Sequence, residues 1–251
     1  MKILIIGDSC TDIYIYGSCN RLCPEGPVPI LLEYSHESFM GMAGNVYKNL
    51  CSFFTEKEID FVTNNFKLME KVRFVDKKTN QMLLRLDTND KCDKITDDIL
   101  DAIPDYDAVL VSDYCKGFLS GEDVIKLARK GKVSFLDSKR KMTKEIVDAF
   151  SYIKLNELEY ENNREIVDLH KKKFVVTRGP NGIFWNGLTL PAPGDVKVSS
   201  VSGAGDVFFV AFAYHMIIGG SEVVDAVQFA QECCTVAIQN KGTCVYATNL
   251  D

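Results

Sequence analysis

Residues 200–209, SVSGAGDVFF, place three small residues directly before a carboxylate, Asp206. Glycines at a helix start let backbone N–H groups converge on an anion, and the helix dipole favours negative charge there. A carboxylate in that first turn is suited to accept the proton of a hydroxyl that attacks the bound anion. The alternative is an ordinary helix start, in which Asp206 complements the dipole and the glycines allow close packing. The local sequence leaves both interpretations open.

A second glycine-rich segment, FMGMAGNVYKNL at 39–50, also reads as the start of a helix. It places Gly41 and Asn45 where the amide of Asn45 could bond a polyol. Asp8 and Asp12, after the first apolar run, add acceptors for sugar hydroxyls. The alternative for each is ordinary capping and turn chemistry.

These side chains need a scaffold, and the apolar patterning predicts an α/β fold with a mostly parallel sheet. Buried strands are expected at 2–6, 108–113, 133–138 and 174–179, with helices at 120–130, 142–149 and 157–170. Ligands of such sheets bind beyond the carboxyl ends of the strands. The polar residues predicted at that edge are Asp8, Asp113, Asp137, Thr177 and Arg178.

Two segments interrupt the alternation, and they predict a small antiparallel sheet. Residues 27–34 and 72–88 read as strands, and the second segment folds back at a Lys-Thr-Asn turn. Met82, Leu84 and Leu86 would share one face of this hairpin, opposite Arg85. The sheet is either a lid over a site or an edge hairpin. We expect a single domain over 1–251, with lid strands at about 13–35 and 72–88.

Composition excludes several classes of partner and site. The chain of 251 residues is 46% hydrophobic with a net charge of −6, so it predicts a globular protein that binds neither nucleic acid nor an anionic membrane. Nine cysteines without a CxxC, and only three histidines, predict reduced thiols rather than disulfides or zinc. The first residues lack a signal peptide, and the apolar run 207–218 is too short to span a bilayer, so a cytoplasmic protein is expected.

Several motifs of large enzyme classes are absent from the sequence. It contains no GxxxxGK[ST], no GxGxxG after the first strand, no GxSxG and no HExxH. These absences argue against P-loop enzymes, Rossmann dinucleotide enzymes, α/β-hydrolases and zincins.

Over nearly its whole length the chain resembles the ribokinase-type (PfkB) carbohydrate kinases. SGAGD resembles the C-terminal signature of that family and MGMAGN its N-terminal one. The blocks GDSCTDIYIYG, RLCPEGPVPIL, VLVSDYCKGFL, DSK, LNELEYE and VVTRGPNG are more specifically similar to kinases of D-glycero-β-D-manno-heptose 7-phosphate in ADP-heptose synthesis. The resemblance implies a ribokinase-like α/β/α domain with a β lid. It also implies phosphorylation of a sugar or sugar-phosphate hydroxyl, most specifically O1 of the heptose phosphate, with ATP and Mg²⁺.

The resemblance also implies roles for particular residues. Asp206 would be the base, and Gly203, Ala204 and Gly205 the anion hole. Asp12, Gly41 and Asn45 would hold the sugar. Candidates for a substrate phosphate are Lys139 with Arg21, Arg73 or Arg85, and Arg85 is preferred because it lies on the polar face of the hairpin and guanidinium suits phosphate.

The resemblance likewise implies which residues bind ATP and Mg²⁺. Asn156 and Glu159 match an NxxE motif that organises Mg²⁺ and phosphate, with Glu159 acting on the metal indirectly. The residues expected to border ATP are Thr177, Arg178, Gly179, Gly182, Asn240 and Gly242.

Two features depart from the family pattern. Ser200 stands where the family usually has an acid associated with a monovalent-cation loop, which leaves activation by potassium open. The segment 50–71 is shorter than usual, so either the sheet edge is trimmed or the substrate rim is remodelled. These departures keep two alternatives open: a kinase-like sugar- or nucleotide-binding regulatory protein without catalysis, and a kinase for another sugar or nucleoside. By resemblance, a homodimer through the lids is expected.

Overall fold

The computed structural model describes residues 1–194, 196–219, 222–240 and 246, and a mixed β-sheet forms its centre. The strand order is β12-β11-β10-β9-β8-β7-β1-β4, and all neighbours are parallel except the pairs made by β11. The strands are β1 (Ile3–Gly7), β4 (Ile59–Thr63), β7 (Tyr106–Asp113), β8 (Gly131–Ser138), β9 (Tyr152–Asn156), β10 (Phe174–Thr177), β11 (Ile183–Trp185) and β12 (Leu188–Leu190).

Helices cover both faces of this sheet and create two cores. On one face Ile3, Ile5 and Leu110 pack against apolar residues of α1 (Ala43–Leu50), α6 (Ala204–Gly219) and α7 (Val223–Ala237). On the other face lie α2 (Asp97–Ala102), α3 (Gly121–Ala128), α4 (Lys144–Ala149) and α5 (Glu157–Leu169). Because β1 and the middle of β7 are buried on both faces, they consist of the apolar runs ILII and AVLV. The predicted α/β fold is confirmed.

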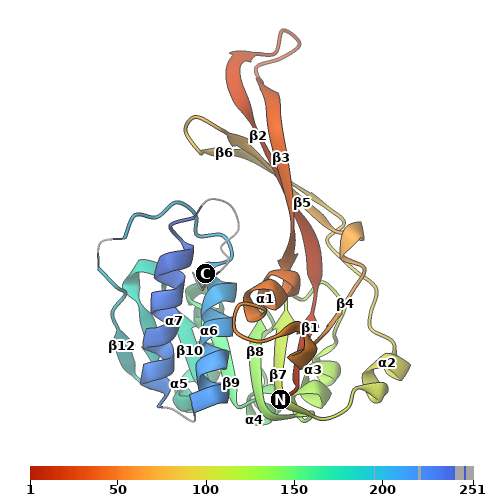
Figure 1. Cartoon of the computed structure of the whole chain (residues 1–251), viewed down its shortest axis with the longest axis vertical. Helices are drawn as coiled ribbons and strands as arrows, with labels where there is room; N and C mark the ends of the chain where they lie inside the picture. The colour runs from red at the N-terminus through yellow and green to blue at the C-terminus, as the bar shows by residue number, and fades with distance from the viewer. Residues whose placement is uncertain (195, 220–221, 241–245, 247–251) are drawn as a thin grey trace.

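A second sheet projects from this body as a long arm (Figure 1). Its order is β3-β2-β5-β6, with β2 (Ser9–Leu22) parallel to β5 (Glu70–Asp76) and the outer pairs antiparallel. β3 (Pro29–Met42) and β6 (Met82–Thr88) form its edges. The structure confirms the predicted hairpin, because Arg85 lies opposite Arg73 while Leu84 and Leu86 lie opposite Phe74 and Val72. We call this sheet the lid sheet.

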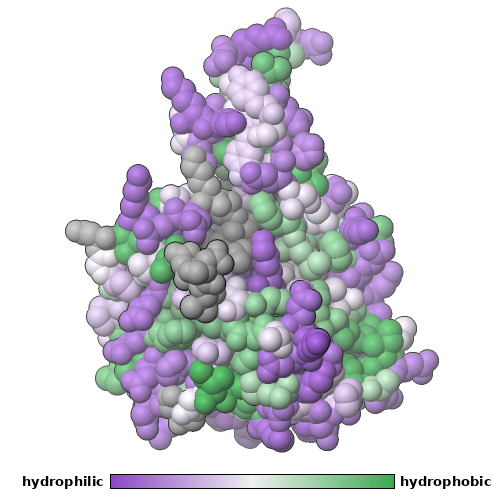
Figure 2. Space-filling view, in the orientation of Figure 1, coloured by the Kyte–Doolittle hydropathy of each residue, from purple (hydrophilic) through white to green (hydrophobic). Residues whose placement is uncertain are grey.

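The lid sheet exposes large apolar side chains. Figure 2 shows hydrophobic residues on the arm among polar ones, well away from the body. Leu84 is 60% exposed and Leu86 52% exposed, on the face opposite Arg85. No helix of the described residues is both long enough and apolar enough to cross a bilayer.

The short segment 50–71 contains one strand, β4, with 3-10 turns on either side at Glu56–Glu58 and Phe66–Leu68. β4 pairs with β1 and is the last strand at that end of the sheet in the described part of the chain. Six residues then lead directly into β5 of the lid sheet.

Candidate active site

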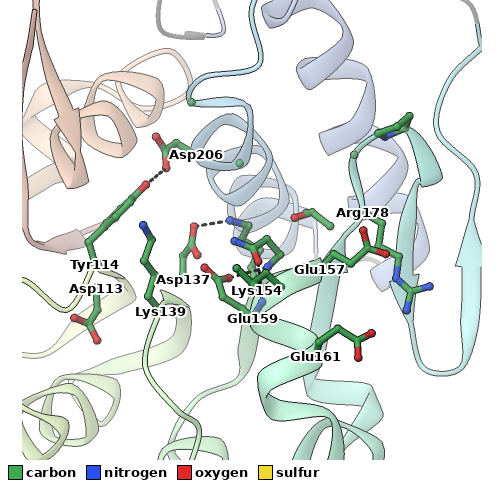
Figure 3. Close-up of a pocket in the computed structure, with 17 residues that line it drawn as sticks. Asp113, Tyr114, Asp137, Lys139, Lys154, Glu157, Glu159, Glu161, Arg178 and Asp206 are labelled. Atoms are coloured by element: carbon green, nitrogen blue, oxygen red, sulfur yellow. Dashed lines mark hydrogen bonds and ion pairs between the residues drawn. The ribbon is translucent and has the colours of Figure 1, made fainter. Parts of the chain in front are cut away.

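A cavity of about 870 Å³ opens beyond the carboxyl ends of β7, β8, β9 and β10, at the starts of α5 and α6. Figure 3 shows the side chains that converge on it. Its lining consists of Asp113, Tyr114, Asp137, Lys139, Lys154, Asn156, Glu157, Leu158, Glu159, Glu161, Thr177, Arg178, Gly179, Pro180, Gly203, Gly205 and Asp206. The site therefore lies where parallel α/β sheets place their ligands.

Asp206 lies in the first turn of α6, and its side chain is held from two directions. Asn45 Nδ2 donates to Oδ2 at 2.7 Å. Tyr114 Oη donates to Oδ1 at 3.1 Å (Figure 3). Burial, assisted by the negative charge of Asp137, raises the pKa of Asp206 to about 6, although the hydrogen bond from Asn45 opposes the rise. A carboxylate with that pKa is ionised at neutral pH and is a stronger base than a solvated aspartate.

The turn before Asp206 offers backbone donors to the cavity. Gly203 has φ of +83°, a left-handed conformation that favours glycine, and it turns the chain into α6. The amides of Ala204 and Asp206 donate to the carbonyls of Val201 and Gly203. The amides of Gly203 and Gly205 have no hydrogen-bond partner among the described residues. Of the three residues predicted to form an anion hole, the two glycines thus have free N–H groups.

Lys154 and Asp137 form a buried ion pair at the floor of the cavity. Lys154 Nζ lies 2.8 Å from Asp137 Oδ2, and both residues are 8% exposed. Burial alone would lower the pKa of Lys154, but Asp137 raises it above its ordinary value, so the side chain is an ammonium ion. The strand β9 places this charge directly below the start of α6.

Asn156 and Glu159 form a capping box at the start of α5. Asn156 Oδ1 accepts from the Glu159 amide and Glu159 Oε2 accepts from the Asn156 amide, both at 2.8 Å. Burial and the charge of Asp137 raise the pKa of Glu159. No group of three or more His, Cys, Asp or Glu side chains in the described part of the chain could hold a metal by itself. Magnesium keeps several waters and binds through one or two carboxylates plus substrate phosphates, so Glu159, which lines the cavity, fits it as an outer oxygen partner.

The strand ends β9 and β10 form the far wall of the cavity. Thr177, Arg178 and Gly179, expected to border ATP, all line it, and the guanidinium of Arg178 lies 5.3 Å from the ring centroid of Tyr160. Gly182 lies outside the lining, but a Cβ there would come within 2.1 Å of the Leu190 carbonyl oxygen. Its role is therefore to let the β10–β11 turn pack. Asn240, after α7, does not line the cavity, and Gly242 lies outside the described residues.

On the lid side, Asp12 and Arg73 form a second ion pair. Arg73 Nη1 lies 2.5 Å from Asp12 Oδ1, and the two residues come from neighbouring strands β2 and β5. A Cβ on Gly41 would lie 2.1 Å from Asp12 Oδ2, so this glycine leaves room for the carboxylate. The predicted sugar residues Asp12 and Gly41 therefore lie together, and the structure couples Arg73 rather than Arg85 to them.

Lys139 points into the space between Tyr114 and Asp137 (Figure 3). Its Nζ lies 4.7 Å from the Tyr114 ring centroid, and Lys71 Nζ lies 5.7 Å from the same ring. Burial lowers the pKa of Lys139, and the positive charge of Lys71 adds to this effect. Two ammonium groups near the same ring repel each other, and an anionic ligand bound near them would reduce this repulsion.

Three predicted substrate residues lie elsewhere. Asp8 is fully buried, and its carboxylate accepts from the amides of Tyr114 and Phe118. Because those bonds occupy it, Asp8 positions the loop that carries Tyr114, and it is not among the residues that line the cavity. Arg85 pairs with Asp87 on the exposed strand β6, and Arg21 is exposed on β2.

Sequence reasoning missed three parts of the site: Tyr114, Lys154 and the pairing of Asn45 with Asp206. A lysine inside the otherwise apolar YIKL of β9 was a signal for a buried, paired charge. Tyr114 follows the strand end at Asp113, which is where ligands are expected. The contact of Asn45 with Asp206 spans 161 residues and has no local sequence signal.

Comparison with known proteins gives a consistent result. The model of the pfkB family carbohydrate kinases matches residues 71–249. The protein named bifunctional protein HldE of Campylobacter jejuni subsp. jejuni serotype O:6 is 30% identical over 96% of this chain and 62% of its own length. The protein of the same name from Aliarcobacter butzleri is 27% identical over 100% of this chain and 63% of its own. The chain thus spans less than two thirds of these relatives.

Among solved structures, the fold is similar to ribokinase from Thermotoga maritima. That structure has a TM-score of 0.71 at 17% identity, covering 97% of this chain and 94% of the other. Arabidopsis thaliana ribokinase complexed with ribose and ATP has a TM-score of 0.68 at 17% identity, covering 96% of this chain and 94% of the other. These similarities identify the fold as ribokinase-like.

Proposed function

Because the chain belongs to the pfkB family of carbohydrate kinases, we propose that it transfers the γ-phosphoryl group of ATP to a hydroxyl of a sugar or sugar phosphate. The observation that carries this proposal is Asp206, a buried carboxylate with a pKa of about 6 beside two free glycine amides. A base next to an anion-binding helix start is what phosphoryl transfer to a hydroxyl requires.

The proposed reaction uses Asp206 as the base. The acceptor hydroxyl gives its proton to Asp206 while its oxygen forms a bond to the γ-phosphorus. The bond from that phosphorus to the bridging oxygen breaks, and ADP leaves with the electron pair. Asn45 and Tyr114 hold the carboxylate in place, and the Gly203 and Gly205 amides receive charge on the transferring group. Magnesium, held through water by Glu159, would offset the charge of the phosphates.

For the acceptor, we propose a sugar phosphate, and specifically O1 of D-glycero-β-D-manno-heptose 7-phosphate. The similarity of the PEGPVP, DYCKG and DSK blocks supports this choice. The ammonium groups of Lys71 and Lys139, both close to the Tyr114 ring, support an acceptor that carries negative charge. Asp12, Gly41 and Arg73 lie at the junction of lid sheet and body, where they would contact the sugar.

The lid sheet has two proposed roles. Its polar face would cover the bound acceptor and exclude water, which competes as a phosphoryl acceptor. Its apolar face, with Leu84 and Leu86 exposed, would pack against the same face of a second copy. We place this homodimer in the cytoplasm, where ATP is available.

A panel of acceptors tests the proposal. ADP release from MgATP is measured with heptose 7-phosphate, unphosphorylated heptose, fructose 6-phosphate, ribose and adenosine. Heptose 7-phosphate is expected to give the highest kcat/KM. A preference for adenosine would reassign the chain as a nucleoside kinase. Sugar binding without turnover of any acceptor would reassign it as a binding protein.

A further inference from the structure

Lys154 lies where the cavity floor meets the start of α6. If Gly205 carried a Cβ, that atom would lie 3.0 Å from Lys154 Nζ and 3.7 Å from Cε. The ammonium group is therefore directly beside a residue whose own N–H is free to bind an anion. The absence of a side chain at Gly205 provides the space that Lys154 occupies.

The hydrogen bonds of Lys154 leave capacity for a ligand. An ammonium group has three N–H donors, and in the described residues Lys154 uses one, toward Asp137. Lys173 gives a comparison within the same chain. Its ammonium donates to the carbonyls of Val147, Asp148 and Phe150, which satisfies all three donors. Lys173 therefore has a structural role, whereas Lys154 retains two donors at the cavity.

The helix start beside Lys154 favours a bound anion. The N-terminus of a helix carries a partial positive charge, so a cation beside it is repelled. Asp137 compensates the buried ammonium, but it lies on the β8 side of the pair rather than at the helix start. An anion between Lys154 and the amides of Gly203 and Gly205 would be attracted by all three groups.

We infer that Lys154 is a catalytic residue that binds the γ-phosphoryl group in the transition state of its transfer. This inference rests on the proposed kinase function and adds a side-chain cation to the anion hole. Nζ donates to a non-bridging oxygen of the γ-phosphoryl group while Asp206 takes the acceptor proton. No bond to the nitrogen forms or breaks, and the ammonium remains protonated throughout. Asp137 positions the ammonium and does not touch the transferred group.

The first test replaces Lys154 with a neutral side chain of similar length. Lys154→Met should lower kcat about 10²–10³-fold, as expected for loss of one donor to a developing anion. KM for the acceptor should change little, because the interaction strengthens in the transition state. Lys173→Met is the matched control, since it removes a lysine that makes only structural hydrogen bonds. It should lower Tm and leave kcat unchanged.

Lys154→Met also leaves Asp137 buried and unpaired, which destabilises the fold. The double variant Lys154→Met/Asp137→Asn removes both charges and should recover much of the lost Tm. If Lys154 had only a structural role, the kcat of the double variant would recover as well. We expect the double variant to remain about 100-fold or more slower than the unchanged protein.

A binding measurement gives a readout that does not depend on turnover. ADP with aluminium fluoride and acceptor mimics the planar phosphoryl group, and it should bind the unchanged protein more tightly than ADP alone. The double variant should bind ADP normally and lose the added affinity. A double variant with near-normal kcat and intact aluminium fluoride affinity would overturn the inference alone. If the unchanged protein phosphorylates no acceptor, the proposed function fails and this inference fails with it.

Discussion

Asn45 Nδ2 lies 2.7 Å from Asp206 Oδ2, which joins the starts of α1 and α6 across the body of the protein. Each of these helix starts lies in a glycine-rich segment. The hydrogen bond directs the amide nitrogen of Asn45 at the carboxylate, so Asn45 acts on the proposed base and not only on a sugar. The same bond opposes the rise in the pKa of Asp206 that burial causes.

The pKa of Asp206 predicts the acid limb of the pH profile. The base must be ionised, so kcat/KM should fall about tenfold per pH unit below about pH 6 and be flat just above it. Asn45→Ala should move this limb to higher pH, because a hydrogen bond to the ionised form is lost. Steady-state rates from pH 5 to 8 measure both effects. A flat profile down to pH 5 would contradict the assignment of Asp206.

Gly41→Ala should weaken acceptor binding selectively. The new Cβ would lie 2.1 Å from Asp12 Oδ2, so the carboxylate must move away from its ion pair with Arg73. We expect KM for the acceptor to rise at least tenfold, with KM for ATP unchanged. Gly26→Ala is the matched control, because a Cβ there meets nothing within 4 Å. Equal KM values for the two variants would show that Asp12 does not contact the acceptor.

Arg73 and Arg85 can be compared directly as acceptor-binding residues. Arg73 is partly buried and paired with Asp12, whereas Arg85 is exposed and paired with Asp87. Arg73→Gln should therefore raise KM for the acceptor more than Arg85→Gln does, by about tenfold or more if a charged pair is lost. The opposite order would support the residue that the sequence favoured.

The exposed apolar face of the lid sheet predicts a dimer, and a single charge introduced on that face should disrupt it. Leu84 is 60% exposed, and burying such a side chain contributes about 1.5–3 kcal/mol in each copy. Leu84→Asp should convert the dimer to a monomer, as measured by light scattering. Leu169→Asp, at the end of α5, changes an equally apolar residue that is 80% exposed and should leave the mass unchanged. A monomeric unchanged protein would refute the proposed dimer.

Much of the scaffold could be predicted because its signals are local. β1 is an apolar run ending in a glycine, β7 contains the apolar run AVLV, and the hairpin of β5 and β6 has a clear turn. The strand predicted at 174–179 ends at Thr177, because the backbone leaves the extended conformation at Arg178 and a 3-10 turn follows at Gly179–Asn181. β3 extends to Met42, much further than its apolar segment, because pairing with β2 and not apolar patterning sustains it.

The sequence predicted many of the residues of the site, but few of the contacts between them. Asp206 and the glycines before it have a recognisable sequence, so their positions were expected. The partners of Arg73 and Asp8 depend on strand register and loop path, which no local pattern encodes. The buried pair of Lys154 and Asp137 likewise joins two strands that touch only in the folded sheet.

Asp206→Asn tests whether Asp206 is the catalytic base, because it removes the base and keeps the shape of the side chain. Burial raises the pKa of Asp206, so its ionised form costs folding free energy above about pH 6, and Asn should not lower Tm at pH 7.5. ADP formation and the phosphorylated sugar are followed together by ³¹P NMR with MgATP and heptose 7-phosphate. The account predicts equal amounts of both products from the unchanged protein, and a kcat about 10²–10⁴-fold lower in the variant with ATP binding retained. Near-normal turnover by Asp206→Asn would contradict it.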